Sequence, residues 1–377
     1  MTPTLFVVGA SCPPEEGLHC KGKIMAKPKV RDRVRDDLSR VRAALYGQAI
    51  GDSLGLRDEF TSAEGIAKRR PDGGPFTFDA VNRADGTSWV PGEWSDDTDR
   101  ALCGLDAILE FPDKPKVLPL SVSFAKRLSA WLASDGRGSG GHTRLVMGHP
   151  LFHINPQVAA RDVWEQSGRN AAPNGAVMGT VAAGIAFPHD LDVTEFLAKA
   201  LCQVTHADPR CVASSVAASI AIASLVQGAP IGGALEEARV HALAYDKDVV
   251  KYLKAELSLK DLKLDEGLPR VVGGKVPPIG FTYKTLGAGV FALQELDRRL
   301  GSWVGSDRNS MLEAAEAFRE ILTLVIRAGG DTDTNAAVAG ALMGASLGMA
   351  YLPTDLVQGM PNRKLLDERL DRLVARL

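Results

Sequence analysis

The feature that most constrains the fold is the run AGGDTDTNAAVAGALMGA at residues 328–345. Asp331, Asp333 and Thr334 lie within four positions, immediately before a stretch of small apolar residues. One short oxygen-bearing side chain is enough to cap a helix, so three of them behind a Gly-Gly pair indicate a further role. A second cluster, WSDDT at residues 94–98, also opens a helix-like run. We therefore predict that two acidic helix starts, far apart in the sequence, contribute to one site.

Composition limits the classes of protein to which the chain can belong. Its 377 residues are 45% hydrophobic and 24% charged, a balance typical of globular proteins. The net charge of −2 gives no footprint for direct nucleic-acid binding, and no apolar run comes near the roughly 20 residues that span a membrane. The five cysteines include no C-x-x-C pair, which favours reduced thiols over disulfides or zinc. We expect a cytoplasmic protein that binds no membrane.

Hydrophobic periodicity predicts an all-α fold. Residues 1–30 contain four prolines and no sustained period, so we expect an irregular N-terminal extension. From residue 31, apolar residues recur at three- and four-residue spacing, strand signals are scarce, and no linker divides the chain. We predict one compact orthogonal helical domain at residues 31–377, with loops at 59–91 and a surface excursion at 247–278. The first predicted helix begins at residue 31. The others span 100–110, 121–133, 174–186, 194–204, 208–227, 231–245, 284–296, 310–327 and 332–351.

The two clusters have the chemistry of hard-cation ligands. Aspartate, serine and threonine oxygens without nearby histidine or cysteine suit Mg²⁺, Mn²⁺ or Ca²⁺ rather than zinc. Taken singly, either cluster is more often a helix cap than a metal site. If they converge, like charges would repel in one pocket, and bound cations would relieve that repulsion. The candidate ligands are Ser95, Asp96, Asp97, Asp331, Asp333 and Thr334, which together could bridge two ions in a cleft.

Four motifs in order along the chain resemble one family. They are GDSLG at 51–55, SDDT at 95–98, NG at 174–175 and GGDTDTN at 329–335. The pattern is similar to that of the ADP-ribosylglycohydrolases and extends from residue 34 to about residue 352. The resemblance implies an all-α domain with a binuclear Mg²⁺ or Mn²⁺ centre held by the six residues above. It also implies that Glu59, seven residues after Asp52, acts in proton transfer, and that Asp97 and Asp333 take part in catalysis.

Further residues are assigned to substrate binding by the same resemblance. Pro173, Asn174 and Gly175 match a loop that lines the ribose and diphosphate, and His206 matches a histidine of the cleft wall. The glycine-rich loop would supply backbone N–H donors to phosphate through Gly138, Ser139, Gly140 and Gly141; a flexible lid is the alternative for this loop. The chain departs from the family where an arginine commonly follows N-G-x-x-M, because Gly179 stands there.

The function implied is metal-dependent hydrolysis of ADP-ribose from modified protein side chains. The partners would be an ADP-ribosylated protein as substrate and ADP-ribose as product, with two Mg²⁺ or Mn²⁺ ions as cofactors. We expect mono-ADP-ribosylarginine as the substrate. Serine-linked ADP-ribose, poly(ADP-ribose) and O-acetyl-ADP-ribose stay open as alternatives, as does a catalytically silent ADP-ribose-binding or crystallin-like protein.

Overall fold

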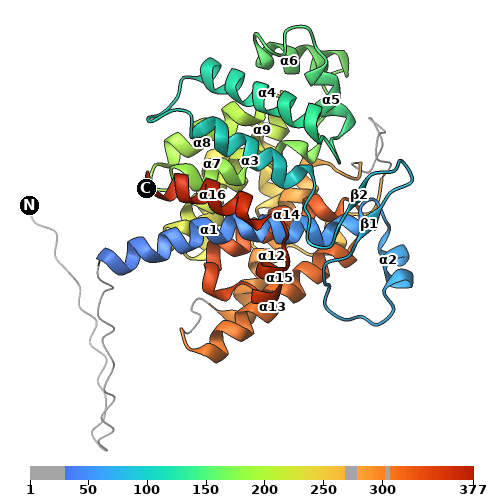
Figure 1. Cartoon of the computed structure of the whole chain (residues 1–377), viewed down its shortest axis with the longest axis vertical. Helices are drawn as coiled ribbons and strands as arrows, with labels where there is room; N and C mark the ends of the chain where they lie inside the picture. The colour runs from blue at the N-terminus through green and yellow to red at the C-terminus, as the bar shows by residue number, and fades with distance from the viewer. Residues whose placement is uncertain (1–29, 268–277, 302–305) are drawn as a thin grey trace, which may run out of the picture.

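A computed structural model describes residues 30–267, 278–301 and 306–377 (Figure 1). Within these ranges the regular secondary structure is almost entirely helical, which confirms the all-α prediction. Strands are confined, in the described part, to a short antiparallel hairpin of β1 (Val81–Asn82) and β2 (Ser88–Trp89). The α-helices are α1 (Val30–Gly55), α2 (Ala63–Arg69), α3 (Asp96–Ile108), α4 (Val117–Ser134), α5 (Gly141–Met147), α6 (Pro156–Gln166), α7 (Val181–Ala186), α8 (Leu191–Cys202), α9 (Pro209–Val226), α10 (Ile231–Ala242), α11 (Leu259–Leu262), α12 (Thr282–Leu300), α13 (Arg308–Arg327), α14 (Thr332–Leu347), α15 (Thr354–Gly359) and α16 (Arg363–Val374).

Short 3₁₀ helices add four more turns, at η1 (Leu56–Asp58), η2 (Asn174–Ala176), η3 (Lys247–Tyr252) and η4 (Met349–Tyr351). The predicted irregular extension, residues 1–30, lies outside the described residues except for Val30, where α1 begins. Buried apolar side chains from α1 through α16 form one continuous cluster, as a single domain over residues 31–377 would require.

Several predicted loops and helices differ from the structure. The segment 59–91, for which the sequence predicts a loop, contains α2, which Ser62 caps by accepting a hydrogen bond from the Gly65 N–H, and the β1–β2 hairpin. The segment 247–278 contains η3 and α11 in its described part. The helix predicted over 174–186 is instead divided into η2 and α7, and the Asn174 backbone N–H at its start bonds to the Gly280 carbonyl. The sequence pattern does not predict helices α5, α6, α15 and α16.

The central packing is between α1 and α14, and α1 crosses the middle of the molecule in Figure 1. Both helices contribute glycines at the crossing. A Cβ atom added to Gly47 would lie 2.1 Å from the Gly340 carbonyl oxygen, and one on Gly340 would lie 2.0 Å from the Gly47 carbonyl oxygen. The absence of side chains at these positions therefore allows the two backbones to approach closely.

Helix α9 is an apolar core helix that also satisfies a membrane criterion. By length and composition alone, its 18 residues could cross a membrane, with a mean hydropathy of 1.5. No apolar run near that length is expected from the sequence pattern, so the apolar run in α9 is longer than expected. However, 89% of it is buried inside the protein, as in the core helices of many proteins without membrane spans, so the criterion is weak evidence here.

Candidate metal centre and substrate cleft

The end of α1 holds the start of α3 through Asp52. One Asp52 carboxylate oxygen accepts a hydrogen bond from the Ser95 backbone N–H at 2.9 Å. The other accepts from the Thr98 N–H at 3.0 Å and from the Thr98 hydroxyl at 2.7 Å. Burial raises the Asp52 pKa to about 6, although these hydrogen bonds to Thr98 and Ser95 act in the opposite direction. Asp52 thus performs the capping that would ordinarily be done by the local residues of α3.

The N-cap residues themselves do not cap their helices with their side chains. Ser95 is the N-cap of α3, and its hydroxyl donates instead to Asp97 Oδ2 at 3.0 Å. Asp331 is the N-cap of α14, and its Oδ1 accepts from the Thr334 hydroxyl at 3.2 Å. The surplus oxygens at both helix starts are therefore turned toward other side chains, so simple helix capping does not account for them.

The two acidic helix starts converge, as the sequence predicted. Carboxylate oxygens of Asp52, Asp97 and Asp333 all lie within 4.8 Å of one another. The same holds for Glu59, Asp331 and Asp333. Asp333 belongs to both groups, so the two sets of oxygens are joined through one side chain.

The electrostatic cost of this convergence is large in the protein alone. Burial, followed by the charges of neighbouring carboxylates, raises the pKa of Asp96, Asp97 and Asp333 well above the usual range for aspartate. In addition, the buried Oδ1 of Asp97 has no hydrogen-bond partner among the described residues. Unpaired, buried carboxylate oxygens are costly unless a proton or a cation compensates them.

These observations fit a hard divalent cation. The two groups consist of carboxylates only, with the hydroxyls of Ser95 and Thr334 beside them. Oxygen-only ligand sets are those preferred by Mg²⁺, Mn²⁺ and Ca²⁺. The unpartnered oxygen of Asp97 supplies a free ligand position. Asp96 belongs to neither close group, although its charge acts on Asp97.

Glu59 reaches the cluster because its loop is bonded to the turn before α14. The Phe60 N–H donates to the Gly330 carbonyl at 2.7 Å, and the Gly330 N–H donates to the Thr61 carbonyl at 2.9 Å. Phe60 has a φ of 57°, a conformation uncommon for a bulky residue, and strain of this kind often marks functional loops. These bonds hold Glu59 next to Asp331.

The Glu59 carboxylate also forms an ion pair with a guanidinium. Arg83, from the stretch between β1 and β2, donates to Glu59 Oε2, and its guanidinium lies 4.9 Å from the centre of the Trp89 ring. Burial and the Asp331 charge raise the Glu59 pKa to about 7, and Arg83 opposes that shift.

The predicted substrate loops border the acidic cluster. Asn174 donates from Nδ2 to Asp331 Oδ2 at 3.0 Å, so it contacts a candidate ligand directly. A Cβ atom on Gly138, whose φ is +82°, would lie 2.4 Å from Asp96 Oδ1. Pro173 and Gly175 adjoin Asn174 at η2.

The rest of the glycine-rich loop leads into α5. Gly140 and Gly141 are exposed at the start of α5, with nothing within 4 Å of a Cβ atom added to Gly140. Ser139 Oγ is buried and has no partner among the described residues. His206 is 1% exposed, and a Cβ atom on Gly175 would lie 3.2 Å from its Nε2.

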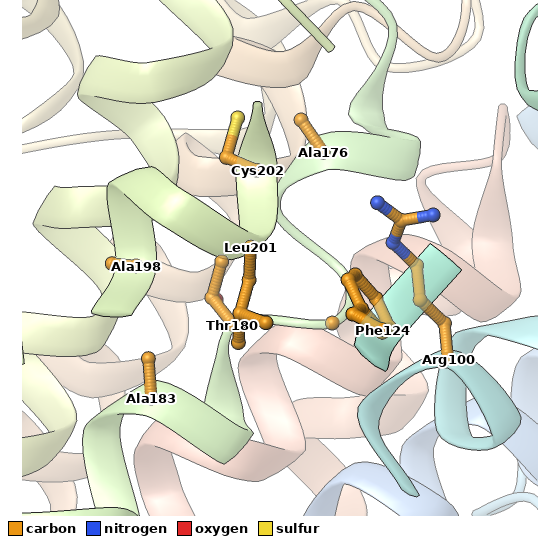
Figure 2. A pocket seen from close by; sticks show the side chains of 9 residues that line it. Arg100, Phe124, Ala176, Thr180, Ala183, Ala198, Leu201 and Cys202 are labelled. Atoms are coloured by element: carbon orange, nitrogen blue, oxygen red, sulfur yellow. The ribbon is translucent and has the colours of Figure 1, made fainter. Parts of the chain in front are cut away.

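An arginine from another helix fills the space beside Gly179. A Cβ atom at position 179 would lie 3.1, 3.2 and 3.3 Å from Cγ, Cδ and Nε of Arg100. Figure 2 shows Arg100 and Phe124 lining the same small pocket, and the Arg100 Cζ is 5.3 Å from the Phe124 ring centre. The departure at Gly179 therefore leaves room for the side chain of Arg100.

Sequence reasoning missed three contributors to this site. The sequence indicates Asp52 only as part of the GDSLG motif and as the reference position for Glu59, and its contacts to α3 have no local signal. Arg83 lies in a segment predicted to be loop. Gly280, with a φ of +77°, approaches both Asn174 and Asp331, since an added Cβ atom would lie 3.3 Å from Asn174 Oδ1 and 3.2 Å from Asp331 Oδ2. The sequence Gly280-Phe281 alone does not indicate that Gly280 lies so close to Asn174 and Asp331.

Comparison with known proteins agrees with the geometry. A family model described as ADP-ribosylglycohydrolase matches residues 33–377. ADP-ribosylhydrolase ARH3 of Danio rerio is 26% identical over 346 residues, covering 84% of this chain and 85% of the relative. ADP-ribosylarginine hydrolase Tri1 of Serratia proteamaculans is 23% identical over 350 residues, covering 91% and 80% respectively. A solved structure titled ADP-ribosylglycohydrolase-related protein complex matches in fold, with a TM-score of 0.59, 22% identity, and coverage of 91% of this chain and 99% of that one.

Proposed function

The chain belongs to the ADP-ribosylglycohydrolase family, and we propose that it uses divalent metal ions to remove ADP-ribose from modified arginine side chains. ADP-ribosyl hydrolase activity in general is supported by the family and by the relatives' names. The observation that carries the metal dependence is the pair of carboxylate groups joined at Asp333. One group would hold a cation through Asp52, Asp97 and Asp333, and the other through Asp331 and Asp333, with the Glu59 carboxylate beside them.

Cations held by these carboxylates would supply the positive charge that polarises the substrate and makes a water more acidic. The chain's own contribution is to orient the substrate and to move a proton. Glu59 would accept the proton of the attacking water at a carboxylate oxygen and return it to the leaving guanidine. The C–N bond at the anomeric carbon breaks, a C–O bond forms, and the unmodified arginine side chain and ADP-ribose are released.

Two observations favour arginine as the acceptor. The Glu59 carboxylate already pairs with a guanidinium, that of Arg83, so this side of the cleft accommodates the group that an arginine substrate would present. One relative carries the name ADP-ribosylarginine hydrolase. Displacement of Arg83 by the substrate guanidine would exchange one charge pair for another.

A direct test compares two matched substrates. The purified protein is incubated with proteins ADP-ribosylated on arginine or on serine, with Mg²⁺ or with a chelator, and released ADP-ribose is measured. Mg²⁺-dependent release from the arginine substrate only is expected. Release from the serine substrate only would contradict the acceptor assignment, and equal release under chelation would contradict the metal dependence.

A variant tests whether the shared carboxylate is needed for turnover. Asp333→Ala removes the side chain shared by both carboxylate groups and should abolish release while the circular dichroism spectrum keeps its helical form. Binding of ADP-ribose by the wild type without any release would instead indicate a silent binding protein.

A further inference from the structure

Three buried residues form a hydrogen-bonded chain that starts on α3 and ends beside Gly175 of the proposed substrate loop. Arg100 donates from a guanidinium nitrogen to the Thr205 hydroxyl oxygen. The same hydroxyl lies 2.7 Å from His206 Nδ1. All three side chains are almost fully buried, at 3%, 0% and 1% exposed. No carboxylate pairs with Arg100 among the described residues, so this guanidinium is not used in an ion pair.

The direction of these hydrogen bonds follows from their chemistry. Arginine can only donate, so the Thr205 oxygen accepts from Arg100 and its single hydrogen is free to donate. The described residues offer that hydrogen one hydrogen-bonding partner, His206 Nδ1. If Nδ1 carried a proton instead, the buried threonine hydrogen would lose its acceptor, which is costly. Nδ1 is therefore the acceptor, and in a neutral ring the proton lies on Nε2.

His206 stays neutral in this environment. Burial, then the nearby His142 and Arg100, lower the pKa of His206 well below its usual value. The Nε2 of His142 lies 3.1 Å from the Thr205 carbonyl oxygen and donates to it, so this nitrogen is not an acceptor for the Thr205 hydroxyl. The ring of His206 thus has one N–H, at Nε2.

That N–H has no partner within the described chain. Nε2 of His206 is buried and unpaired. It faces the position that a side chain would fill at residue 175, where an added Cβ atom would lie 3.2 Å from Nε2 and 3.8 Å from the Thr143 hydroxyl. Gly175 directly follows Asn174, which bonds to Asp331. The unused donor and the missing side chain therefore occur together, next to the acidic cluster.

The family resemblance already assigns His206 to the substrate site; we infer that Arg100 and Thr205 are positioning residues that fix its Nε2–H tautomer, so that the ring can donate a hydrogen bond to an oxygen of ADP-ribose beside Gly175. The identity of the ligand rests on the proposed function. The tautomer itself does not, because it follows from the hydrogen bonds of the free protein. Gly179 belongs to the same arrangement, since the Arg100 side chain passes through the space that it leaves.

The tautomer is measured directly by ¹⁵N NMR of histidine-labelled protein without ligand. In the wild type, His206 should show a protonated Nε2 and an unprotonated Nδ1. Thr205→Val keeps the shape but removes the hydroxyl, so a protonated Nδ1 should become populated; Thr205→Ser should restore the wild-type spectrum. A wild-type protein with a protonated Nδ1, or a valine variant with an unchanged spectrum, overturns the inference.

Binding of ADP-ribose provides the second readout. Thr205→Val should raise the Kd about tenfold, and Thr205→Ser should bring it back. His206→Gln keeps an N–H near the Nε2 position and should bind more tightly than His206→Asn, whose amide is closer to the Nδ1 position. This pair keeps the test valid if the valine variant fails to fold. Equal losses for glutamine and asparagine would overturn the donor role.

The two proposals fail in different ways. Correct spectra with no binding of ADP-ribose to the wild type would refute the ligand part of this inference and the proposed function together. Normal binding and turnover with an unchanged Kd in Thr205→Val would refute the positioning role alone.

Discussion

Replacing Asp97 by asparagine should stabilise the metal-free protein. Its carboxylate oxygen lies within 4.8 Å of oxygens from Asp52 and Asp333. Two full charges at that separation repel by about 3.5 kcal/mol at an effective dielectric constant of 20. Partial protonation of the cluster reduces the realised gain to about 1–3 kcal/mol. Asparagine keeps the shape and can still accept from the Ser95 hydroxyl, so little else is lost.

Bound metal should offset the stability advantage of the variant. Mg²⁺ at one hundred times its Kd should stabilise the wild type by about 2.7 kcal/mol, because binding occurs only in the folded state. The Asp97→Asn variant loses a ligand charge and should gain much less. Scanning calorimetry of chelator-treated protein, with and without added Mg²⁺, measures both effects; the metal-free variant should melt about 1–4 °C higher than the wild type.

A second aspartate on the same helix provides the control. Asp106 of α3 forms ion pairs with Arg369 and Arg372, so Asp106→Asn removes attraction rather than repulsion. It should lower the melting temperature slightly and leave the Mg²⁺ response intact. The reasoning is refuted if metal-free Asp97→Asn melts below the wild type, or if Mg²⁺ stabilises both proteins equally.

Two further predictions concern the helix crossing and the proton carrier. Gly340→Ala should destabilise the protein by about 3 kcal/mol or more in denaturant unfolding, because the new Cβ atom would lie 2.0 Å from a backbone oxygen of α1. The control is Gly232→Ala, where nothing lies within 4 Å of the new Cβ atom. This variant should be neutral or more stable by up to about 1 kcal/mol. Equal effects would show that crowding is not the cause. Glu59→Gln should lower the single-turnover rate far more than the calorimetric affinity for ADP-ribose, while Glu64→Gln, in an exposed pair with Lys68, should change neither; an unchanged rate would remove Glu59 from proton transfer.

The sequence predicts the long helices well because their signals are local. Helices α1, α3, α9 and α13 carry periodic apolar residues, and each lies where its pattern indicated. The segment 174–186 misled the prediction for the same reason. Its small apolar residues favour a helix locally, but the side chain of Asn174 is bonded to Asp331 and Thr285 from distant parts of the chain. No local pattern reports such contacts.

The site was predictable to the extent that its residues cluster in sequence. Asp97 and Asp333 lie in dense acidic runs, so the sequence alone is enough to propose that they converge. Asp52 stands alone in a helical stripe, and its role in holding Thr98 spans 46 residues of chain. Arg100 and Thr205 look like ordinary polar residues in sequence. Their positioning role is indicated only by the structure, in which both are buried and Nε2 of His206 next to them has no partner among the described residues.

The crossing of α1 and α14 explains why the acidic residues meet at all. Gly55, the last residue of α1, packs so closely on α14 that an added Cβ atom would lie 2.5 Å from the Cα atom of Asp333. The Thr332 hydroxyl donates to the Gly55 carbonyl at 2.7 Å and fixes the register between the helices. Because Asp52 lies one turn before Gly55, this register also sets the separation of the Asp52 and Asp333 carboxylates. The glycines that permit the crossing therefore determine the geometry of the site as well as the stability of the core, and a substitution at the crossing should weaken Mg²⁺ binding even where the helices still form.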